Sequence, residues 1–373
     1  MDKLFKQVKL GNKFTLKNSI VMAPMTTWAS NDDYTVSNEE ISYYKVRNMG
    51  AGMIITGCAH VQENGIGFTN EFANYDDSFI PGLKKLADSL KHNGAKAILQ
   101  INHAGNKALP QLISNSDVIS ASSVETLATA FAPSLTPREL NEEEIYDVIK
   151  AFGQATRRAI EAGFDGVEIH GAHGFLIQNF VSPFFNKRTD KWGGSLENRL
   201  RFPIELVKEV KRVIDEYADR PFILGYRVSP DEPMDGALRM TDTNVLIKEL
   251  IGLDIDYIHA SLLDAVNSQP IDAVGEETYL NVISKVVDDR IPLIVAGSLQ
   301  TPNQVDYILK NGAALAALGH AFVTEPQWVE KVESGRSDEL RLTIKKSDMK
   351  DLNLPEKLWN FIQMSDGWFN IEE

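Results

Sequence analysis

The 373-residue chain is poor in cysteine, in long apolar runs and in clustered basic residues. Its one cysteine, Cys58, cannot form an internal disulfide, a CxxC pair or a four-cysteine iron–sulfur site. No apolar run approaches the roughly 18 residues of a transmembrane helix, and residues 1–17 lack the continuous apolar core of a signal peptide. The 38 basic and 52 acidic side chains, without a basic cluster, argue against nucleic-acid binding. We expect a cytoplasmic protein that binds neither membranes nor nucleic acids.

Eight short apolar runs alternate with longer segments of helical spacing. The runs are rich in Val, Ile and Ala and are continuously apolar, as expected of strands covered on both faces. Eight strands alternating with helices, with no linker, predict a single α/β domain, the (β/α)8 or TIM barrel. A doubly wound sheet is the second choice, weakened because no GxGxxG follows the first run. The runs cover residues 19–25, 51–57, 95–102, 165–171, 221–228, 254–260, 291–297 and 314–319.

Polar residues mark where several helices begin. Ser37 with Glu40 three residues later predicts a capping box. Asn141 precedes three acids, which the N-terminal end of a helix dipole favours. Thr241 and Thr301 are predicted to cap two more helices, the latter followed by a proline at the first helical position.

Two long connections and the C-terminal tail lie outside this alternation. Residues 102–140 and 182–197 each follow the C-terminal end of a strand, where barrel enzymes place their sites. We expect the barrel to span residues 1–335. The extension 336–373 carries four large aromatic residues and is expected to pack on the barrel or on a neighbouring subunit of a homo-oligomer. These are Trp359, Phe361, Trp368 and Phe369.

Two histidines lie at and just beyond the C-terminal end of the fourth run. His170 and His173 can both point into the barrel mouth, where two imidazole N–H groups would hold an oxygen on which negative charge develops. Glu168 has the same parity as His170, so a metal site is an alternative, although a catalytic metal needs at least three ligands. A purely structural pair is the other alternative. The residue types alone leave these choices open.

A longer pattern around the histidines is more specific. His-Gly-Ala-His-Gly at 170–174 precedes a Ser-Pro and then Asn-x-Arg-Thr-Asp-x-Trp-Gly-Gly-Ser-x-Glu-Asn-Arg at 186–199. This pattern resembles the signature of the Old Yellow Enzyme-like flavin oxidoreductases, with Trp192 in place of a frequent tyrosine. The likeness extends over residues 1–333 and favours the short, FMN-only branch of the family.

The resemblance implies an enzyme that binds FMN in a TIM barrel and contains no metal. NADH or NADPH would reduce the flavin, and hydride would pass from flavin N5 to a small electron-poor acceptor such as an enone, a quinone or a nitro compound. Both the dinucleotide and the acceptor would use one pocket. His170 and His173 would bind the oxygen of the acceptor.

The same resemblance implies which strand ends hold the flavin ring. Ala23, Pro24, Met25 and Thr26 resemble the segment that lies against the ring, with the Thr26 hydroxyl beside its reactive edge and counted among the catalytic residues. Gly57 matches a small residue that lets the ring lie close. Gln100 would offer an amide to the pyrimidine edge, and Arg227 a charge that stabilises the reduced ring. A structural hydrogen bond of Gln100 and a salt bridge between Arg227 and Asp231 are the alternatives.

The last two strands are implied to hold the phosphate of FMN. Gly297 with Ser298, and Gly319 with His320, offer backbone N–H groups where many barrels bind phosphate. Relatives usually carry arginine at the position of His320. Because the charge of histidine depends on pH near neutrality, the affinity for FMN is expected to be pH-sensitive there.

Trp28 and Phe175 are implied to line the acceptor pocket beside the two histidines. In many relatives the residue at Phe175 is a tyrosine that protonates the substrate carbon, and phenylalanine has no acidic proton. Efficient alkene reduction is therefore not expected. One alternative function is a flavin-binding redox partner with little turnover of its own. The other is a metal-dependent barrel hydrolase or lyase that uses Glu168, His170 and His173.

Overall fold

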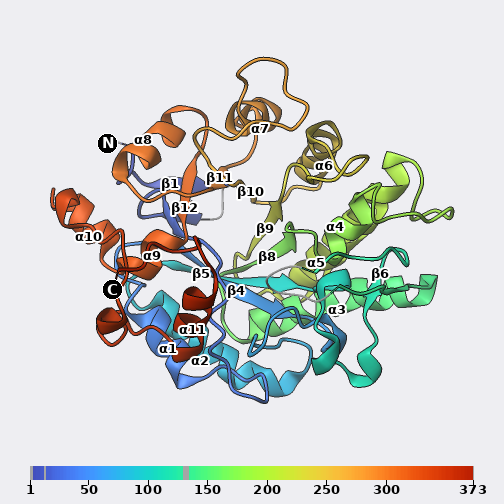
Figure 1. The fold of residues 1–373 in the computed structure, drawn as a ribbon, viewed down its shortest axis with the longest axis horizontal. Helices are drawn as coiled ribbons and strands as arrows, with labels where there is room; N and C mark the ends of the chain where they lie inside the picture. The colour runs from blue at the N-terminus through green and yellow to red at the C-terminus, as the bar shows by residue number, and fades with distance from the viewer. Residues whose placement is uncertain (1–2, 12–13, 129–133, 373) are drawn as a thin grey trace.

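The barrel is the organising feature of the computed structural model, which describes residues 3–11, 14–128 and 134–372. Eight parallel strands close on one another, with helices outside them (Figure 1). This confirms the predicted TIM barrel, and each strand overlaps one predicted run. The strands are β3 (Ile20–Met22), β4 (Met53–His60), β5 (Lys96–Asn102), β8 (Gly166–Gly171), β9 (Ile223–Val228), β10 (Tyr257–Ser261), β11 (Leu293–Ala296) and β12 (Leu315–Leu318).

Apolar side chains cover both faces of these strands, which explains their continuously apolar sequences. One buried cluster fills the interior and includes Val21, Ile98 and Ile294. The hairpin of β1 (Val8–Leu10) and β2 (Phe14–Leu16) adds Leu10 and Leu16 to that cluster. Because this hairpin directly precedes β3, it closes the end of the barrel where the strands begin. The opposite end is left for the functional side chains.

A second buried cluster lies between the strands and the surrounding helices. The longer helices are α1 (Asn38–Lys45), α2 (Ile80–Lys91), α3 (Glu142–Glu161), α5 (Leu196–Tyr217), α6 (Met240–Gly252), α7 (Tyr279–Val287) and α8 (Pro302–Lys310). The shorter or terminal ones are α4 (Leu176–Val181), α9 (His320–Thr324), α10 (Trp328–Glu333) and α11 (Glu356–Met364).

Three of the four predicted helix starts are confirmed, and one differs. Asn141 begins α3 with a complete capping box, and Thr301 caps α8 ahead of Pro302. Ser37 caps α1, but the box there is wrong, because the Glu40 carboxylate turns away to accept hydrogen bonds from Thr27 Oγ1 and Ser30 Oγ.

The predicted cap at Thr241 is wrong, because the N-cap of α6 lies two residues earlier, at Arg239. The Arg239 guanidinium donates to the carbonyl oxygens of Glu232 and Met234. These tertiary contacts hold the loop before α6, so the helix starts without a side-chain cap.

The C-terminal extension folds back on the barrel of its own chain. Leu358, Trp359 and Ile362 of α11 belong to the buried cluster beneath the helices, and Figure 1 shows α11 beside α1. The Glu356 N–H donates to Glu39 of α1 at 3.1 Å. The division at residue 335 and a homo-oligomer remain predictions. Within the three described ranges, no helix is long and apolar enough to span a membrane.

Candidate functional site

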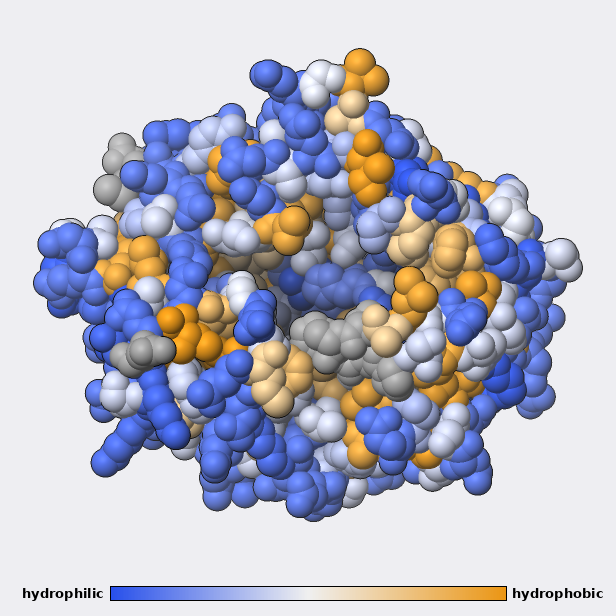
Figure 2. Space-filling view, viewed as in Figure 1, coloured by the Kyte–Doolittle hydropathy of each residue, from blue (hydrophilic) through white to orange (hydrophobic). Residues whose placement is uncertain are grey.

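Three neighbouring strand ends bring the polar residues of the barrel mouth together. In the parallel register His170 of β8 lies opposite Arg227 of β9, and Arg227 lies opposite His259 of β10. Ser261, two residues after His259, ends β10. The face in Figure 2 is hollowed near its centre, and hydrophilic side chains line the hollow.

His170 and His173 form a close pair, with their ring centroids 5.0 Å apart and their planes at 76°. His170 is 3% exposed, and its Nδ1 accepts the backbone N–H of Ala172 at 3.3 Å. That backbone group can only donate, so the proton of a neutral His170 sits on Nε2. His173 adopts a left-handed φ of 60°, and its own N–H donates to Ser229 Oγ at 3.0 Å.

Both imidazoles are neutral at neutral pH. Burial lowers the pKa of His170 well below its ordinary value, and the positive charges around it lower that pKa further. The ring of His173 is open to the hollow but lies deep below the surrounding surface. Burial again lowers its pKa, followed by the charges of Arg227 and Lys107. The pair therefore offers uncharged N–H donors.

Glu168 is the anion at the floor of this site. Its fully buried carboxylate accepts hydrogen bonds from Gln100 Nε2 at 2.7 Å and Tyr257 OH at 3.0 Å, and it contacts His259 Nδ1 at 2.8 Å. Burial alone would raise the pKa of Glu168, but His259, Arg227 and the hydrogen bond from Gln100 together lower it. Glu168 is therefore ionised, and Gln100 keeps its oxygen as the group that can accept from a ligand.

These contacts bear on the alternatives left open by the sequence. Glu168 is engaged by Gln100, Tyr257 and His259 and does not join the His170–His173 pair, and the described residues hold no group of three metal-ligating side chains. Asp231 bonds to Tyr279 and to the Ile271 N–H, so the salt bridge suggested for Arg227 does not form. The structural hydrogen bond suggested for Gln100 does form.

Arg227 instead donates from Nη2 to Ser261 Oγ at 3.0 Å. Its Nε is buried and has no hydrogen-bond partner within the described part of the chain. The same Ser261 hydroxyl lies 2.8 Å from His173 Nε2. Sequence reasoning missed Ser261, because a serine at the end of a strand carries no periodic signal.

Met25 lies close to two other predicted flavin contacts, Gly57 and Gly319. A Cβ atom at Gly57 would lie 2.7 Å from the Met25 carbonyl oxygen, and one at Gly319 would lie 3.0 Å from Met25 Sδ. Gly57 lies inside β4, where the register with β5 shifts, and does not end the strand as predicted. Both glycines thus permit close packing of the segment after β3. Whether they also contact the flavin remains a prediction.

Thr26 lies beside the single cysteine. Burial raises the pKa of the Cys58 thiol well above its ordinary value, and that thiol is hydrogen-bonded to Glu71 and Thr26. The cysteine is therefore buried and a protonated thiol at neutral pH, which is the unreactive form.

An aromatic wall runs from the histidine pair to the C-terminal extension. The ring centroid of Phe175 lies 4.9 Å from that of His170 and 6.1 Å from that of Phe68. The centroids of Phe68 and Trp28 are 5.7 Å apart. Trp28 then stacks on Phe361 of α11, with centroids 4.2 Å apart and planes at 10°. The sequence showed the aromatic residues of the tail but not that they extend this wall.

The predicted phosphate end is also bordered by the tail. The ring centroid of His320 lies 5.7 Å from that of Trp368 and 4.3 Å from that of Phe369. Burial lowers the pKa of His320, so pH sensitivity of a phosphate site here is expected below neutrality rather than near it. Gly297 and Ser298 contact the segment after β10, where Ser298 Oγ donates to the Leu263 carbonyl at 2.8 Å.

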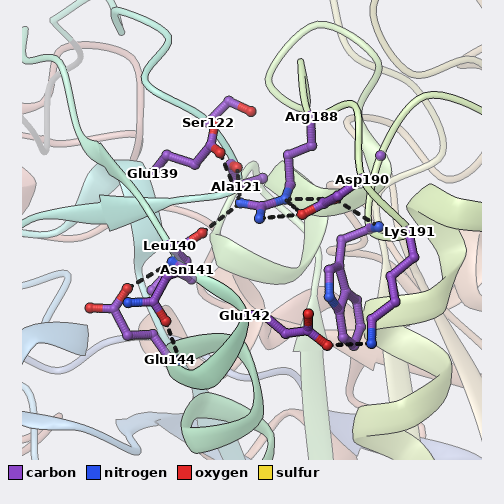
Figure 3. A network of polar contacts seen from close by, with 12 residues as sticks. Ala121, Ser122, Glu139, Leu140, Asn141, Glu142, Glu144, Arg188, Asp190 and Lys191 are labelled. Carbon is purple, nitrogen blue, oxygen red and sulfur yellow. Dashed lines mark hydrogen bonds and ion pairs between the residues drawn. The ribbon is translucent and has the colours of Figure 1, made fainter.

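The signature segment 186–199 follows α4 and runs into α5. Its two arginines, Arg188 and Arg199, bind neighbouring segments. Figure 3 shows the Arg188 guanidinium between Asp190 and the carbonyl oxygens of Ala121 and Leu140, the latter at 2.6 Å. Arg199 pairs with Asp242 of α6 at 3.2 Å. These contacts fasten the segment to the 102–140 connection and to α6.

The donor set at the barrel mouth fits a flavin. The buried, unpartnered Nε of Arg227 and the remaining oxygen of Gln100 provide a cationic donor and an acceptor. An isoalloxazine ring carries alternating donors and acceptors that such a pair can meet. Met25 and Thr26 are half-exposed at the neighbouring strand end.

Comparison with known proteins agrees with this donor set. The family described as "NADH:flavin oxidoreductase / NADH oxidase family" matches residues 3–339. The probable NADH-dependent flavin oxidoreductase YqiG of Bacillus subtilis (strain 168) is 43% identical over 98% of this chain and 97% of its own length. The NADH:fumarate oxidoreductase of Klebsiella pneumoniae (strain 342) is 36% identical over 96% of this chain, which spans only 39% of that protein.

Among solved structures, morphinone reductase in complex with tetrahydroNAD is similar with a TM-score of 0.75 and 26% identity. The match covers 89% of this chain and 91% of that one.

Glu168 gives a direct test of the charge arrangement. Glu168→Gln replaces an acceptor of several hydrogen bonds and leaves Arg227 less compensated, so the free energy of unfolding at pH 7 should fall by about 3–5 kcal/mol. The pKa of Glu168 is lower in the folded protein than in the unfolded chain, so ionised Glu168 stabilises the native state above the ordinary pKa of a glutamate. This contribution is lost as the pH falls. The variant lacks it and should therefore lose stability less steeply in acid.

Urea unfolding at several pH values measures both effects. The control is Glu143→Gln, at an exposed position in the first turn of α3. Equal stability of the two variants at pH 7 would contradict a structural anion at Glu168.

Proposed function

The chain belongs to the NADH:flavin oxidoreductase / NADH oxidase family, and from that premise we propose that His170 and His173 bind the oxygen of a small electron-poor acceptor. The observation that carries the proposal is the pair of neutral imidazoles beside Arg227, whose ring centroids are 5.0 Å apart. The family uses FMN with NADH or NADPH. Bound FMN would supply the hydride-transfer chemistry that links the dinucleotide to the acceptor.

The residues proposed to hold FMN come from six strands of the barrel and from the segments that directly follow them. Gln100 and Arg227 would meet the polar edge of the ring, where the fixed charge of Arg227 favours the anionic reduced state. His320 and the neighbouring backbone would meet the phosphate. The full proposed set is Ala23, Pro24, Met25, Thr26, Gly57, Gln100, Arg227, Gly297, Ser298, Gly319 and His320, with Trp28 and Phe175 beside the acceptor.

Neutral imidazoles suit an acceptor oxygen that gains charge. Two fixed N–H donors stabilise negative charge as it develops, and they need no reorganisation at that moment. They also leave the electron-poor acceptor without a full positive charge to repel it. Quinones, nitro compounds and enones each place an oxygen in conjugation with the reducible bond, so each is a candidate.

Phe175 narrows this choice. Its ring lies 4.9 Å from His170, in contact with the pair, and it supplies no proton. Oxygen and nitrogen atoms of a reduced quinone or nitro group exchange protons with water directly, whereas an alkene carbon needs a positioned acid. We therefore propose quinones and nitro compounds as better acceptors than alkenes.

A second candidate is a redox module that delivers its electrons to a partner protein. It is favoured by the Klebsiella relative, in which the part similar to this chain is 39% of a longer NADH:fumarate oxidoreductase. Such a module would be reduced by the dinucleotide but would turn over small acceptors slowly.

An anaerobic visible spectrum with NADH or NADPH separates these functions. Both flavin proposals predict a flavin spectrum that bleaches on addition of the dinucleotide. Rapid return of the colour with a quinone such as menadione supports the first proposal, and persistent bleaching with both a quinone and a nitro compound supports the second. A protein that takes up no FMN would contradict both.

The histidine assignment predicts the behaviour of one variant. His170→Ala should weaken binding of 4-chlorophenol at least tenfold, because one of two charge-assisted hydrogen bonds worth about 1.5 kcal/mol or more is lost. FMN should stay bound, since His170 is proposed to contact the acceptor. Perturbation of the flavin absorbance by the phenol gives the affinity. His92→Ala, outside the site, is the matched control, and an unchanged phenol affinity in His170→Ala would refute the assignment.

The role of Phe175 can be tested by restoring a phenol. Phe175→Tyr should raise the ratio of enone to quinone turnover by roughly 100-fold, the lower range for a positioned general acid. Steady-state rates with cyclohexenone and menadione give that ratio. Phe68→Tyr, on the adjacent ring of the aromatic wall, controls for a phenol that is merely nearby. A ratio equal to that of the unmodified protein would mean that proton supply does not limit enone reduction.

A further inference from the structure

Ser261 joins the two sides of the proposed site. Its Oγ lies 3.0 Å from Nη2 of Arg227, the proposed flavin contact, and 2.8 Å from Nε2 of His173, the proposed acceptor contact. It ends β10 and is partly exposed.

The direction of these two hydrogen bonds follows from the chemistry of the groups. A guanidinium has only donors, so Ser261 Oγ accepts from Arg227. The serine hydroxyl has one hydrogen to give, and Arg227 cannot receive it. Within the described part of the chain, His173 Nε2 is the other polar group on this hydroxyl. Donation to Nε2 is the arrangement that gives this hydrogen a partner among the described residues, and it would leave the imidazole proton on Nδ1.

We propose that Ser261 is a positioning residue that sets the tautomer of His173, so that Nδ1–H is the group left to bind the acceptor's oxygen. The inference rests on the proposed function, because it assigns a role to the same pair of histidines. It adds a residue that touches neither the acceptor nor the reacting atoms.

The other degrees of freedom of His173 are already restrained. Its N–H donates to Ser229 Oγ at 3.0 Å, its carbonyl accepts from Lys107 Nζ at 2.5 Å, and its backbone is left-handed. Its neutral state, caused by burial and by the charges of Arg227 and Lys107, leaves two tautomers to choose between. The hydrogen bond from Ser261 makes that choice.

The result complements His170. The backbone N–H of Ala172 occupies Nδ1 of His170, which leaves Nε2–H as its donor. The pair would thus offer Nε2–H from one ring and Nδ1–H from the other, and two donors can converge on one oxygen. Because the Ser261 hydroxyl is itself polarised by Arg227, its hydrogen bond to Nε2 is strengthened, which makes the Nδ1–H of His173 a better donor.

The tautomer can be read directly by NMR of the FMN-loaded protein with 15N-labelled histidine. Seven histidines give few enough signals for assignment by substitution. We expect His173 to show a protonated Nδ1 and an unprotonated Nε2 in the unmodified protein and in Ser261→Thr, which keeps the hydroxyl. Ser261→Ala should give a mixture of tautomers. A protonated Nε2 on neutral His173 in the unmodified protein would overturn the inference, and this measurement needs no variant to fold.

Binding of 4-chlorophenol separates this inference from the proposed function. Ser261→Ala should weaken the phenol about tenfold, as expected for one hydrogen bond, and Ser261→Thr should restore the affinity to within a few-fold. If His173→Ala and His170→Ala both bind the phenol normally, the proposed function fails. If they lose it while Ser261→Ala binds like the unmodified protein, only the role of Ser261 fails.

Discussion

The permanent positive charge of Arg227 in the barrel interior is the constraint on which the rest of the site depends. A guanidinium does not lose its proton in a protein, and this one is 7% exposed. Glu168 stays ionised nearby, with Arg227 among the causes that lower its pKa. The pKa values of His170, His173 and His259 are all lowered, first by burial and also by Arg227. Arg227 therefore acts together with burial to keep the neighbouring imidazoles neutral, and together with His259 and Gln100 to keep the neighbouring carboxylate charged. The proposed binding of an acceptor oxygen depends on this charge pattern.

The fold protects this arrangement from both ends. The β1–β2 hairpin fills the end where the strands begin, and the C-terminal extension borders the open end through Phe361 on Trp28 and Phe369 on His320. Aromatic walls exclude water, and exclusion of water strengthens the hydrogen bonds inside. Arg188 joins the segment after α4 to the 102–140 connection through the backbone carbonyls of Ala121 and Leu140. Rigid strand ends and a fastened loop together keep the donors where they are needed.

The barrel could be predicted because eight continuously apolar runs require cover on both faces, and the strand ends could be predicted as the place for polar residues. The partners of those residues could not. His259 and Tyr257 lie within a strand, and their contact with Glu168 depends on the register between β8, β9 and β10. Ser261 became visible only once Arg227 and His173 were placed on either side of it. The capping box predicted at Ser37 does not form for a similar reason, because the Glu40 carboxylate accepts hydrogen bonds from Thr27 and Ser30, which local sequence does not reveal.

A crystal structure of the FMN-loaded protein with 4-chlorophenol bound tests the roles of His170, His173 and Ser261 most directly. We expect the phenol oxygen within about 2.6–3.2 Å of both His170 Nε2 and His173 Nδ1, with Ser261 Oγ still between Arg227 and His173. A phenol oxygen held instead by Lys107 or by water, with the two imidazoles turned away, would contradict it.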